Sequence, residues 1–282
     1  MNRIFDKNNI KIAAFDVDGT IFHEGRVSDA VKDAIKKLHE SGIITVIATG
    51  RMRYYMVKSV MDLGVFRYGV FGNGTVVWDF EEEKTIALQA FEPKMAEDIL
   101  RYVDTFTNAY SADFENENGL TPRLLELLRE EIKLEIPKDG SLPKEVHTIY
   151  ENLLEHVAQK GEPIVKMRAN FLSVEERVHA MDKIGTAFEV EISSTSGKDI
   201  GITPLGANKG TGLEALCAHL GHDASNIIAF GDGGNDVEML KRAGFAVVLG
   251  NGQDSAKAVA DYITKPVWED GVALAISELF GV

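Results

Sequence analysis

The chain has 282 residues but a single cysteine, Cys217, so an internal disulfide is impossible and a zinc site built from several thiolates is excluded. Long apolar runs are also missing: no stretch of about 18 apolar residues occurs, so we expect no membrane-spanning segment. The opening residues, MNRIFDKNNIK, lack the apolar stretch of a secretory signal. From these absences we expect a soluble, cytoplasmic protein.

Basic residues are scarce relative to acidic ones. Lysine and arginine total 30 against 44 aspartates and glutamates, which gives a net charge of −14. Proteins that bind nucleic acid need a basic surface to neutralise phosphates, and anionic membranes attract basic segments, so we expect neither partner. A small phosphorylated ligand is still compatible with this charge, because one local cationic pocket is enough to bind it.

Apolar runs alternate with helical patterns at both ends of the chain. Runs at 11–15, 43–48 and 68–71 are separated by helical spacing at 28–40 and 52–62. The same alternation returns after Gly206, with helices at 209–220 and 235–243 and apolar runs at 227–230 and 245–249. Continuous apolar strands that alternate with helices predict a doubly wound, mostly parallel α/β sheet covered on both faces.

The middle of the chain follows a different pattern. Strands are expected at 85–90, 164–169, 188–192 and 199–203, helices at 94–107 and 174–184, and irregular structure at 108–150. This mixture predicts an inserted α+β domain over 84–203. The α/β core is then discontinuous, formed by residues 1–83 and 204–282.

Acidic residues follow the first apolar run, in the sequence Asp16-Val17-Asp18-Gly19-Thr20. Ligands of open α/β sheets bind at the carboxyl ends of the strands, where Asp16 is expected. Two carboxylates this close repel each other unless a cation neutralises them, and their oxygens suit Mg²⁺. A plain turn would use the same residue types, so this motif alone does not decide.

A second motif, Thr49-Gly50-Arg51, follows the second apolar run. A hydroxyl and free backbone N–H groups at a helix start suit a phosphate, although threonine also caps many helices. A third candidate is Lys209, at the start of a predicted helix. The helix dipole disfavours a cation there, so an anionic partner would explain this lysine, whereas a solvated surface lysine is the alternative.

The fourth motif is Gly231-Asp232-Gly233-Gly234-Asn235-Asp236, directly after another apolar run. Asp232 is placed to complete a metal site with Asp16 and Asp18. Asn235 and Asp236 could orient a lysine or metal-bound water. A flexible loop is the alternative for this motif too, but four such loops at the strand ends of one sheet favour a shared site.

In this order the four motifs resemble those of the haloacid dehalogenase-like phosphohydrolases, and the Gly72-Asn73-Gly74 turn and the segment 269–272 resemble the Cof-type subgroup. The position and size of the insert are similar to the larger (C2-type) α+β cap of that superfamily. The resemblance implies a Rossmann-like core and a Mg²⁺-dependent phosphatase that acts on small phosphorylated metabolites, plausibly sugar phosphates.

The resemblance also implies roles for the motif residues. Asp16 would be the nucleophile that forms an aspartyl-phosphate, and Asp18 would protonate the leaving oxygen and later activate water. Lys209 would neutralise charge on the phosphoryl group. The remaining roles are phosphate binding by Thr49, Gly50 and Asn235, Mg²⁺ binding by Asp16, Asp18 and Asp232, and support behind these ligands by Asp236.

Two other functions stay open at this point. A phosphotransferase such as a phosphomannomutase-like enzyme has the same acidic motif but returns the phosphoryl group to a sugar. A non-catalytic sensor of phosphorylated ligands on the same fold is the third reading. The sequence does not give the oligomeric state.

Other polar segments gave weaker signals. Residues 113–119 are acidic but lack the positions of an EF-hand, so we expect a solvated acidic loop. Lys166 and Arg168 are basic candidates on one strand of the insert. Cys217 is expected to be a packed thiol, and no histidine is assigned a role.

Overall fold

The computed structural model describes residues 3–132, 147–194 and 197–282. The chain divides into two compact units, a core unit of Met1–Leu88 with Asn208–Val282 and an inserted unit of Gln89–Ala207. The expected insert began at residue 84. Residues 84–88 instead form a strand that pairs with the core sheet, which is why the core unit extends to Leu88.

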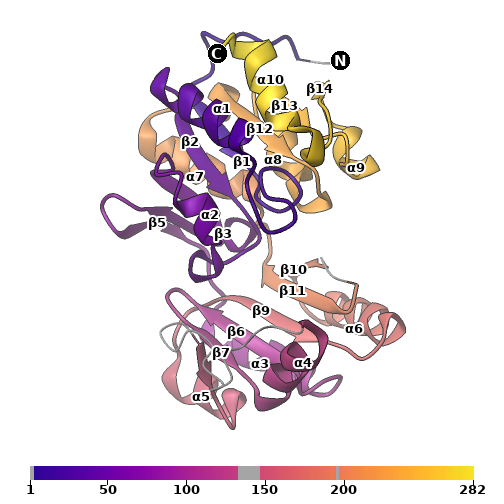
Figure 1. The fold of residues 1–282 in the computed structure, drawn as a ribbon. Coiled ribbons are helices and arrows are strands. Elements are labelled where there is room, and N and C mark those ends of the chain that lie inside the picture. Colours follow the sequence, from indigo (N-terminus) through magenta and orange to yellow (C-terminus); the bar gives the residue numbers. More distant parts are fainter. Residues whose placement is uncertain (1–2, 133–146, 195–196) are drawn as a thin grey trace. The chain divides into compact units, whose positions relative to one another are not determined.

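The core unit contains an eight-stranded sheet in the order β14-β13-β12-β1-β2-β3-β4-β5 (Figure 1). The six strands from β14 to β3 are parallel, whereas β4 and β5 are antiparallel additions at one edge. The strands are β1 (Ile12–Phe15), β2 (Ile44–Ala48), β3 (Tyr68–Phe71), β4 (Val76–Asp79), β5 (Lys84–Leu88), β12 (Ile227–Gly231), β13 (Phe245–Val248) and β14 (Tyr262–Ile263).

Helices cover both faces of this sheet, as expected for a doubly wound fold. On one side α1 packs against α10, and on the other α7 packs against α8. Short 3₁₀ turns lie at 53–55, 72–74, 224–226, 234–236 and 267–269. The helices are α1 (Asp29–Glu40), α2 (Lys58–Met61), α7 (Lys209–Leu220), α8 (Val237–Arg242), α9 (Asp254–Lys257) and α10 (Gly271–Phe280).

Apolar side chains explain why the central strands hold together. Every residue of β1 is buried, as is typical of a parallel strand with helices on both faces. The α7 helix contributes Leu213, Leu216 and Cys217 to the apolar cluster beneath the sheet. Burial, followed by nearby acidic residues, raises the pKa of the Cys217 thiol to about 11, which fits a packed rather than a reactive cysteine.

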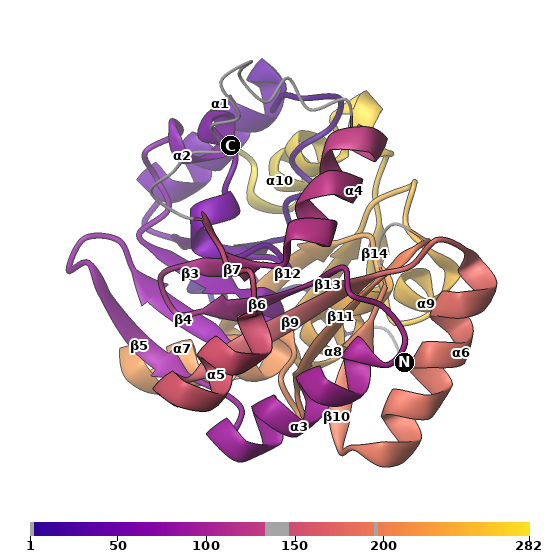
Figure 2. The same cartoon turned by 90° about the horizontal axis from the view of Figure 1, so that it is seen from below.

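The inserted unit is a six-stranded sheet in the order β10-β11-β9-β6-β7-β8. Its pairs are antiparallel except for β7 with β8. Helices α3, α5 and α6 lie along one face (Figure 2). The elements are α3 (Pro93–Asp104), β6 (Tyr110–Phe114), β7 (Asn118–Leu120), α4 (Pro122–Ile132), β8 (His147–Ile149), α5 (Leu153–Lys160), β9 (Ile164–Asn170), α6 (Val174–Ala187), β10 (Val190–Ser193) and β11 (Asp199–Pro204).

The stretch 108–150 is more regular than its sequence indicated. Its described part forms three strands and a helix, and residues 133–146 lie outside the described residues. Pro122 misled the interpretation: it is the first residue of α4, a position where the missing N–H costs nothing. The expected solvated loop is also wrong, since Asp113 and Asn118 are each 1% exposed and joined by a hydrogen bond of 2.7 Å.

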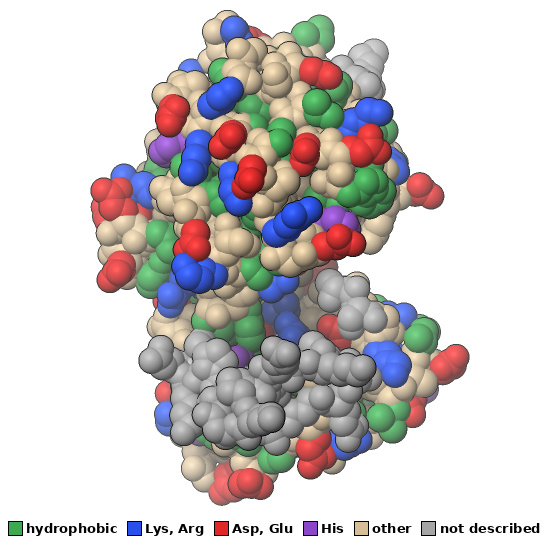
Figure 3. All heavy atoms as spheres, in the orientation of Figure 1, with side chains coloured by type: hydrophobic (Ala, Val, Ile, Leu, Met, Phe, Trp, Pro, Cys, Tyr) green, Lys and Arg blue, Asp and Glu red, His purple; other side chains and the backbone are tan. Residues whose placement is uncertain are grey.

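The surface of the core unit carries charges of both signs. Figure 3 shows acidic and basic side chains interspersed over the part that the core helices cover. Among the described residues, no helix combines the length and the apolar character that a bilayer crossing requires.

Candidate active site

Three neighbouring strands bring the predicted motifs to one edge of the core sheet. The order β12-β1-β2 is parallel, so the carboxyl ends of these strands lie side by side. Asp16 follows β1, Thr49 follows β2, and Asp232 follows β12. The topology therefore brings Asp232 close to Asp16, although 216 positions separate them in the sequence.

Lys209 lies at the centre of this edge. It is the first residue of α7, it is fully buried, and its Nζ lies 2.6 Å from Asp16 Oδ1 and 2.5 Å from Asp236 Oδ1. A helix start is unfavourable for a cation, and burial without partners would be more unfavourable still. The two carboxylates offset both costs, so the surface-lysine alternative is wrong.

A glycine turn fixes the start of α7. Asn208 caps the helix by accepting from the Thr211 N–H, which fixes the adjacent Lys209. Gly74 has a φ of +99°, and a Cβ on it would lie 2.0 Å from the Asn208 carbonyl oxygen. Only a residue without a side chain lets this turn approach so closely, so Gly74 sets the position of the buried lysine.

Three carboxyl groups surround the lysine. One oxygen each from Asp16, Asp232 and Asp236 lies within 4.8 Å of the others. Asp236 Oδ2 accepts the backbone N–H groups of Asp232 and Gly233, which holds this loop closed. Asp232 accepts from Thr20 Oγ1 at 2.9 Å. Asp236 thus supports the loop and Lys209 together.

The charges of this cluster do not balance. Burial and repulsion by Asp236 raise the pKa of Asp16 to about 8, against the opposing effect of Lys209. Burial, followed by Asp236, also raises the pKa of Asp232. Burial alone would lower the pKa of Lys209, but the carboxylates raise it well above its usual range, so the ammonium stays charged.

The donor set fits a divalent cation. One ammonium faces three carboxyls, and a second positive charge would offset the burial and the repulsion that raise the pKa values of Asp16 and Asp232. Hard carboxylate oxygens are the ligands that Mg²⁺ prefers.

Asp18 lies apart from the three clustered carboxyls. Its two oxygens accept from Arg51 Nε at 2.7 Å and Arg51 Nη2 at 2.6 Å, and its side chain is half exposed. Of the predicted metal ligands, Asp16 and Asp232 therefore lie together with Asp236, while the Asp18 carboxylate is held in a two-point contact by Arg51. The motif Thr49-Gly50-Arg51 does not by itself indicate this role of the Arg51 guanidinium.

The predicted phosphate-binding residues converge on one asparagine. Thr49 is buried, and its Oγ1 accepts the Arg51 N–H at 3.1 Å. Asn235 Nδ2 donates to Asn73 Oδ1 at 3.1 Å, and a Cβ on Gly50 would lie 2.9 Å from that same oxygen. Asn73, with a φ of +58°, thus joins the second and fourth motifs.

Sequence reasoning missed two asparagines of this site. Asn73 was expected only as part of a glycine turn typical of the subgroup. Asn251 was not among the predicted site residues, although its Nδ2 donates to the Gly19 carbonyl at 2.9 Å and to Asp232 Oδ2 at 3.3 Å. Both asparagines stand between two glycines, and this shared pattern was the available signal.

Known proteins match the chain over nearly its whole length. A family model described as haloacid dehalogenase-like hydrolase matches residues 13–276. The 5-amino-6-(5-phospho-D-ribitylamino)uracil phosphatase YcsE of Bacillus subtilis (strain 168) is 28% identical, over 95% of this chain and 95% of its own. The HMP-PP phosphatase of Serratia proteamaculans (strain 568) is 30% identical, over 88% of this chain and 87% of its own.

Solved structures agree on the fold. A sugar phosphatase of HAD subclass IIB superposes with a TM-score of 0.78 at 24% identity, over 96% of this chain and 99% of its own. The expected α/β core with an inserted α+β unit is therefore confirmed, as is the predicted resemblance. The chain belongs to the haloacid dehalogenase-like hydrolases, Cof-type, and is an enzyme of the phosphatase class.

Proposed function

We propose that the chain is a Mg²⁺-dependent phosphatase of small phosphorylated metabolites that works through an aspartyl-phosphate on Asp16. The observation that carries the proposal is the buried Lys209 ammonium between Asp16 and Asp236, beside Asp232. A buried, paired cation at the carboxyl ends of the strands can stabilise an anionic reacting group. Phosphoryl transfer depends mainly on such charge neutralisation and positioning.

In the first step, an oxygen of Asp16 attacks phosphorus, and the bond between phosphorus and the ester oxygen breaks. Asp18 gives its proton to the departing oxygen, so the alcohol leaves neutral. The Thr49 hydroxyl, the Gly50 N–H and the Asn235 amide bind the phosphoryl oxygens. Lys209 stays protonated, as its raised pKa requires, and balances the negative charge that gathers near Asp16.

In the second step, Asp18 takes a proton from water as the water oxygen attacks phosphorus. The bond between phosphorus and Asp16 breaks, which frees inorganic phosphate and restores the carboxylate. The two-point contact with Arg51 would hold the Asp18 carboxylate, the form that accepts this proton, in one orientation for the second step.

The proposed metal ligands are oxygens of Asp16, Asp18 and Asp232, with the acidic cluster supporting the first and third. For Asp18 the resemblance implies the backbone carbonyl, which leaves its carboxylate available for proton transfer. Bound Mg²⁺ would supply positive charge that screens the approach of the Asp16 carboxylate to an anionic ester. Asp236 would remain behind this set, holding Lys209 and the loop.

The proposed substrate class is a small sugar phosphate or a related metabolite of the cytoplasm. The name of the Bacillus subtilis relative, a phosphatase of a phospho-ribityl compound, supports a phosphorylated polyol chain as one candidate. The net charge of −14 is compatible with such a ligand if a divalent cation bound by the acidic cluster adds its charge to that of Lys209.

The test measures inorganic phosphate released from a panel of sugar phosphates and p-nitrophenyl phosphate, with Mg²⁺ and with chelator. We expect release only with Mg²⁺ and none from the Asp16→Asn variant. Conversion of a hexose 1-phosphate to the 6-phosphate without release would instead indicate a mutase. Tight ester binding without turnover would indicate a sensor. Either result would overturn the proposal.

A further inference from the structure

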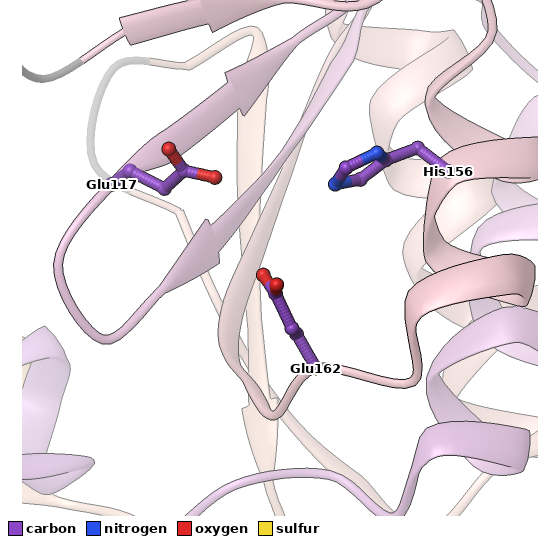
Figure 4. Close-up of side chains that lie close together, drawn as sticks. All are labelled: Glu117, His156 and Glu162. Carbon is purple, nitrogen blue, oxygen red and sulfur yellow. The ribbon is translucent and has the colours of Figure 1, made fainter.

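A second cluster of metal-ligating side chains lies in the inserted unit. One ligand atom each from Glu117, His156 and Glu162 lies within 4.8 Å of the others, and all three residues are half-buried (Figure 4). Glu117 belongs to the turn between β6 and β7, His156 to α5, and Glu162 to the connection from α5 to β9. The cluster contains no residue of the phosphatase site.

Aromatic contacts fix the imidazole of His156. The Tyr150 ring lies against it at 3.9 Å between centroids with 35° between the planes, and the Phe114 ring meets it edge-on at 6.0 Å. With the ring plane set in this way, the far ring nitrogen faces the space between the two carboxyl groups in Figure 4.

That nitrogen lacks a partner. His156 Nε2 is buried from solvent, and within the described part of the chain it has no hydrogen-bond partner. A buried polar atom without a partner is destabilising, and such atoms in folded proteins call for a specific explanation. A cation bound by the nitrogen and the two facing carboxylates would provide one.

The distances allow such a cation after a small closure. Ligand atoms around a tetrahedral Zn²⁺ lie about 3.4 Å apart, given bond lengths near 2.1 Å. The three ligand atoms now lie within 4.8 Å of one another, and rotation of the two glutamate side chains would bring them to this spacing. Partners already orient these carboxyls, because the Tyr150 hydroxyl lies 3.3 Å from Glu117 Oε1 and Lys160 Nζ lies 3.3 Å from Glu162 Oε1.

The donor set selects the metal. An imidazole nitrogen with two carboxylate oxygens suits Zn²⁺ and related transition metals, whereas Mg²⁺ prefers oxygen ligands alone. We propose that Glu117, His156 and Glu162 form a Zn²⁺ site, with water in the fourth position. Bound there, the ion would join the β6–β7 turn to both ends of the segment 156–162, and so would brace the inserted unit. This inference is independent of the proposed phosphatase function.

The experiment is equilibrium dialysis of the full chain against Zn²⁺ alone as the probe, in excess Mg²⁺, followed by metal analysis. We expect the wild type to keep about one zinc ion per chain. The His156→Gln and Glu162→Gln variants should lose this ion, because each lacks one of the three protein ligands. His179→Gln, an exposed histidine on α6, is the matched control and should keep the zinc. Asp232→Asn shows whether the zinc occupies the catalytic cluster instead.

Three results would overturn the proposal: no retained zinc in the wild type, retention by both His156→Gln and Glu162→Gln, or loss in Asp232→Asn. The thermal midpoint provides a second readout, since a ligand that binds only the folded state raises it. Zinc should raise the thermal midpoint of the wild type and of His179→Gln, but not that of His156→Gln or Glu162→Gln. Unchanged Mg²⁺-dependent turnover in Glu162→Gln checks its folding, and a failed phosphatase proposal leaves the zinc count unaffected.

Discussion

Replacing Lys209 with methionine removes the ammonium while keeping the length of the side chain. The lysine is fully buried and touches Asp16 and Asp236 at 2.6 and 2.5 Å. Removing one partner from a buried charge pair typically costs about 3–5 kcal/mol of unfolding free energy, because the remaining carboxylates lose their counter-charge. We expect a loss of about this size near pH 8.5 in the absence of divalent metal.

The loss should shrink in acid. The pKa of Asp16 is already raised to about 8 in the folded protein, and losing the lysine raises it further. A carboxyl with a raised folded pKa favours the folded state below its unfolded value and loses that contribution as the pH rises through the folded value. Near pH 5 Asp16 is protonated with or without the lysine, so the destabilisation should fall by about half.

The assay is urea unfolding followed by tryptophan fluorescence. Both tryptophans, Trp78 and Trp268, belong to the core unit, so the signal reports the unit that holds Lys209. The control is Lys241→Met, which removes an exposed lysine on α8 and should change stability by less than about 0.5 kcal/mol. A loss below about 1 kcal/mol at every pH, or a loss that grows in acid, would refute this electrostatic reasoning.

Gly74→Ala should lower the free energy of unfolding by at least about 2 kcal/mol and reduce turnover, because the new Cβ would clash with the N-cap carbonyl of α7. The control is Gly64→Ala, which is also at positive φ but in open space, and which should cost about 1 kcal/mol in the same urea assay. Equal losses in the two variants would contradict the role of the close approach. Asp18→Asn should slow turnover about 100-fold or more. The variant should still accumulate phosphoenzyme from p-nitrophenyl phosphate, because that leaving group needs little protonation, and mass spectrometry after an acid quench measures the phosphoenzyme. Mg²⁺ must displace the proton of Asp16, so the apparent affinity for Mg²⁺ should rise about tenfold per pH unit below the Asp16 pKa of about 8 and level off above it. Calorimetry measures this affinity, and an affinity that does not change with pH would argue against the raised pKa.

Local sequence signals were enough for the fold of the core. Apolar runs such as Ile12–Phe15 and Ile227–Gly231 are short and bounded by glycine or acidic turns, and parallel sheets require such runs. Because the carboxyl ends of parallel strands share an edge, the strand positions also predicted which motifs lie together. The family prediction is confirmed, while the individual roles of the site residues stay predictions.

Contacts between distant loops were beyond local signals. The pairing of Asp18 with Arg51 and the link from Asn235 to Asn73 depend on how four loops meet, which no spacing within one loop encodes. The stretch after Asn108 was also misread. Proline usually interrupts a helical or strand pattern, but Pro122 is the first residue of α4 and follows the β6–β7 hairpin in the sequence.

The most direct test of the central claim is a rapid acid quench during turnover in Mg²⁺, followed by mass spectrometry of the peptide that contains Asp16. The account predicts one added phosphoryl group on Asp16 in the wild type, lost on hydroxylamine treatment, and neither adduct nor turnover in Asp16→Asn. Full turnover by Asp16→Asn, or a phosphoryl group found on another residue instead, would contradict it.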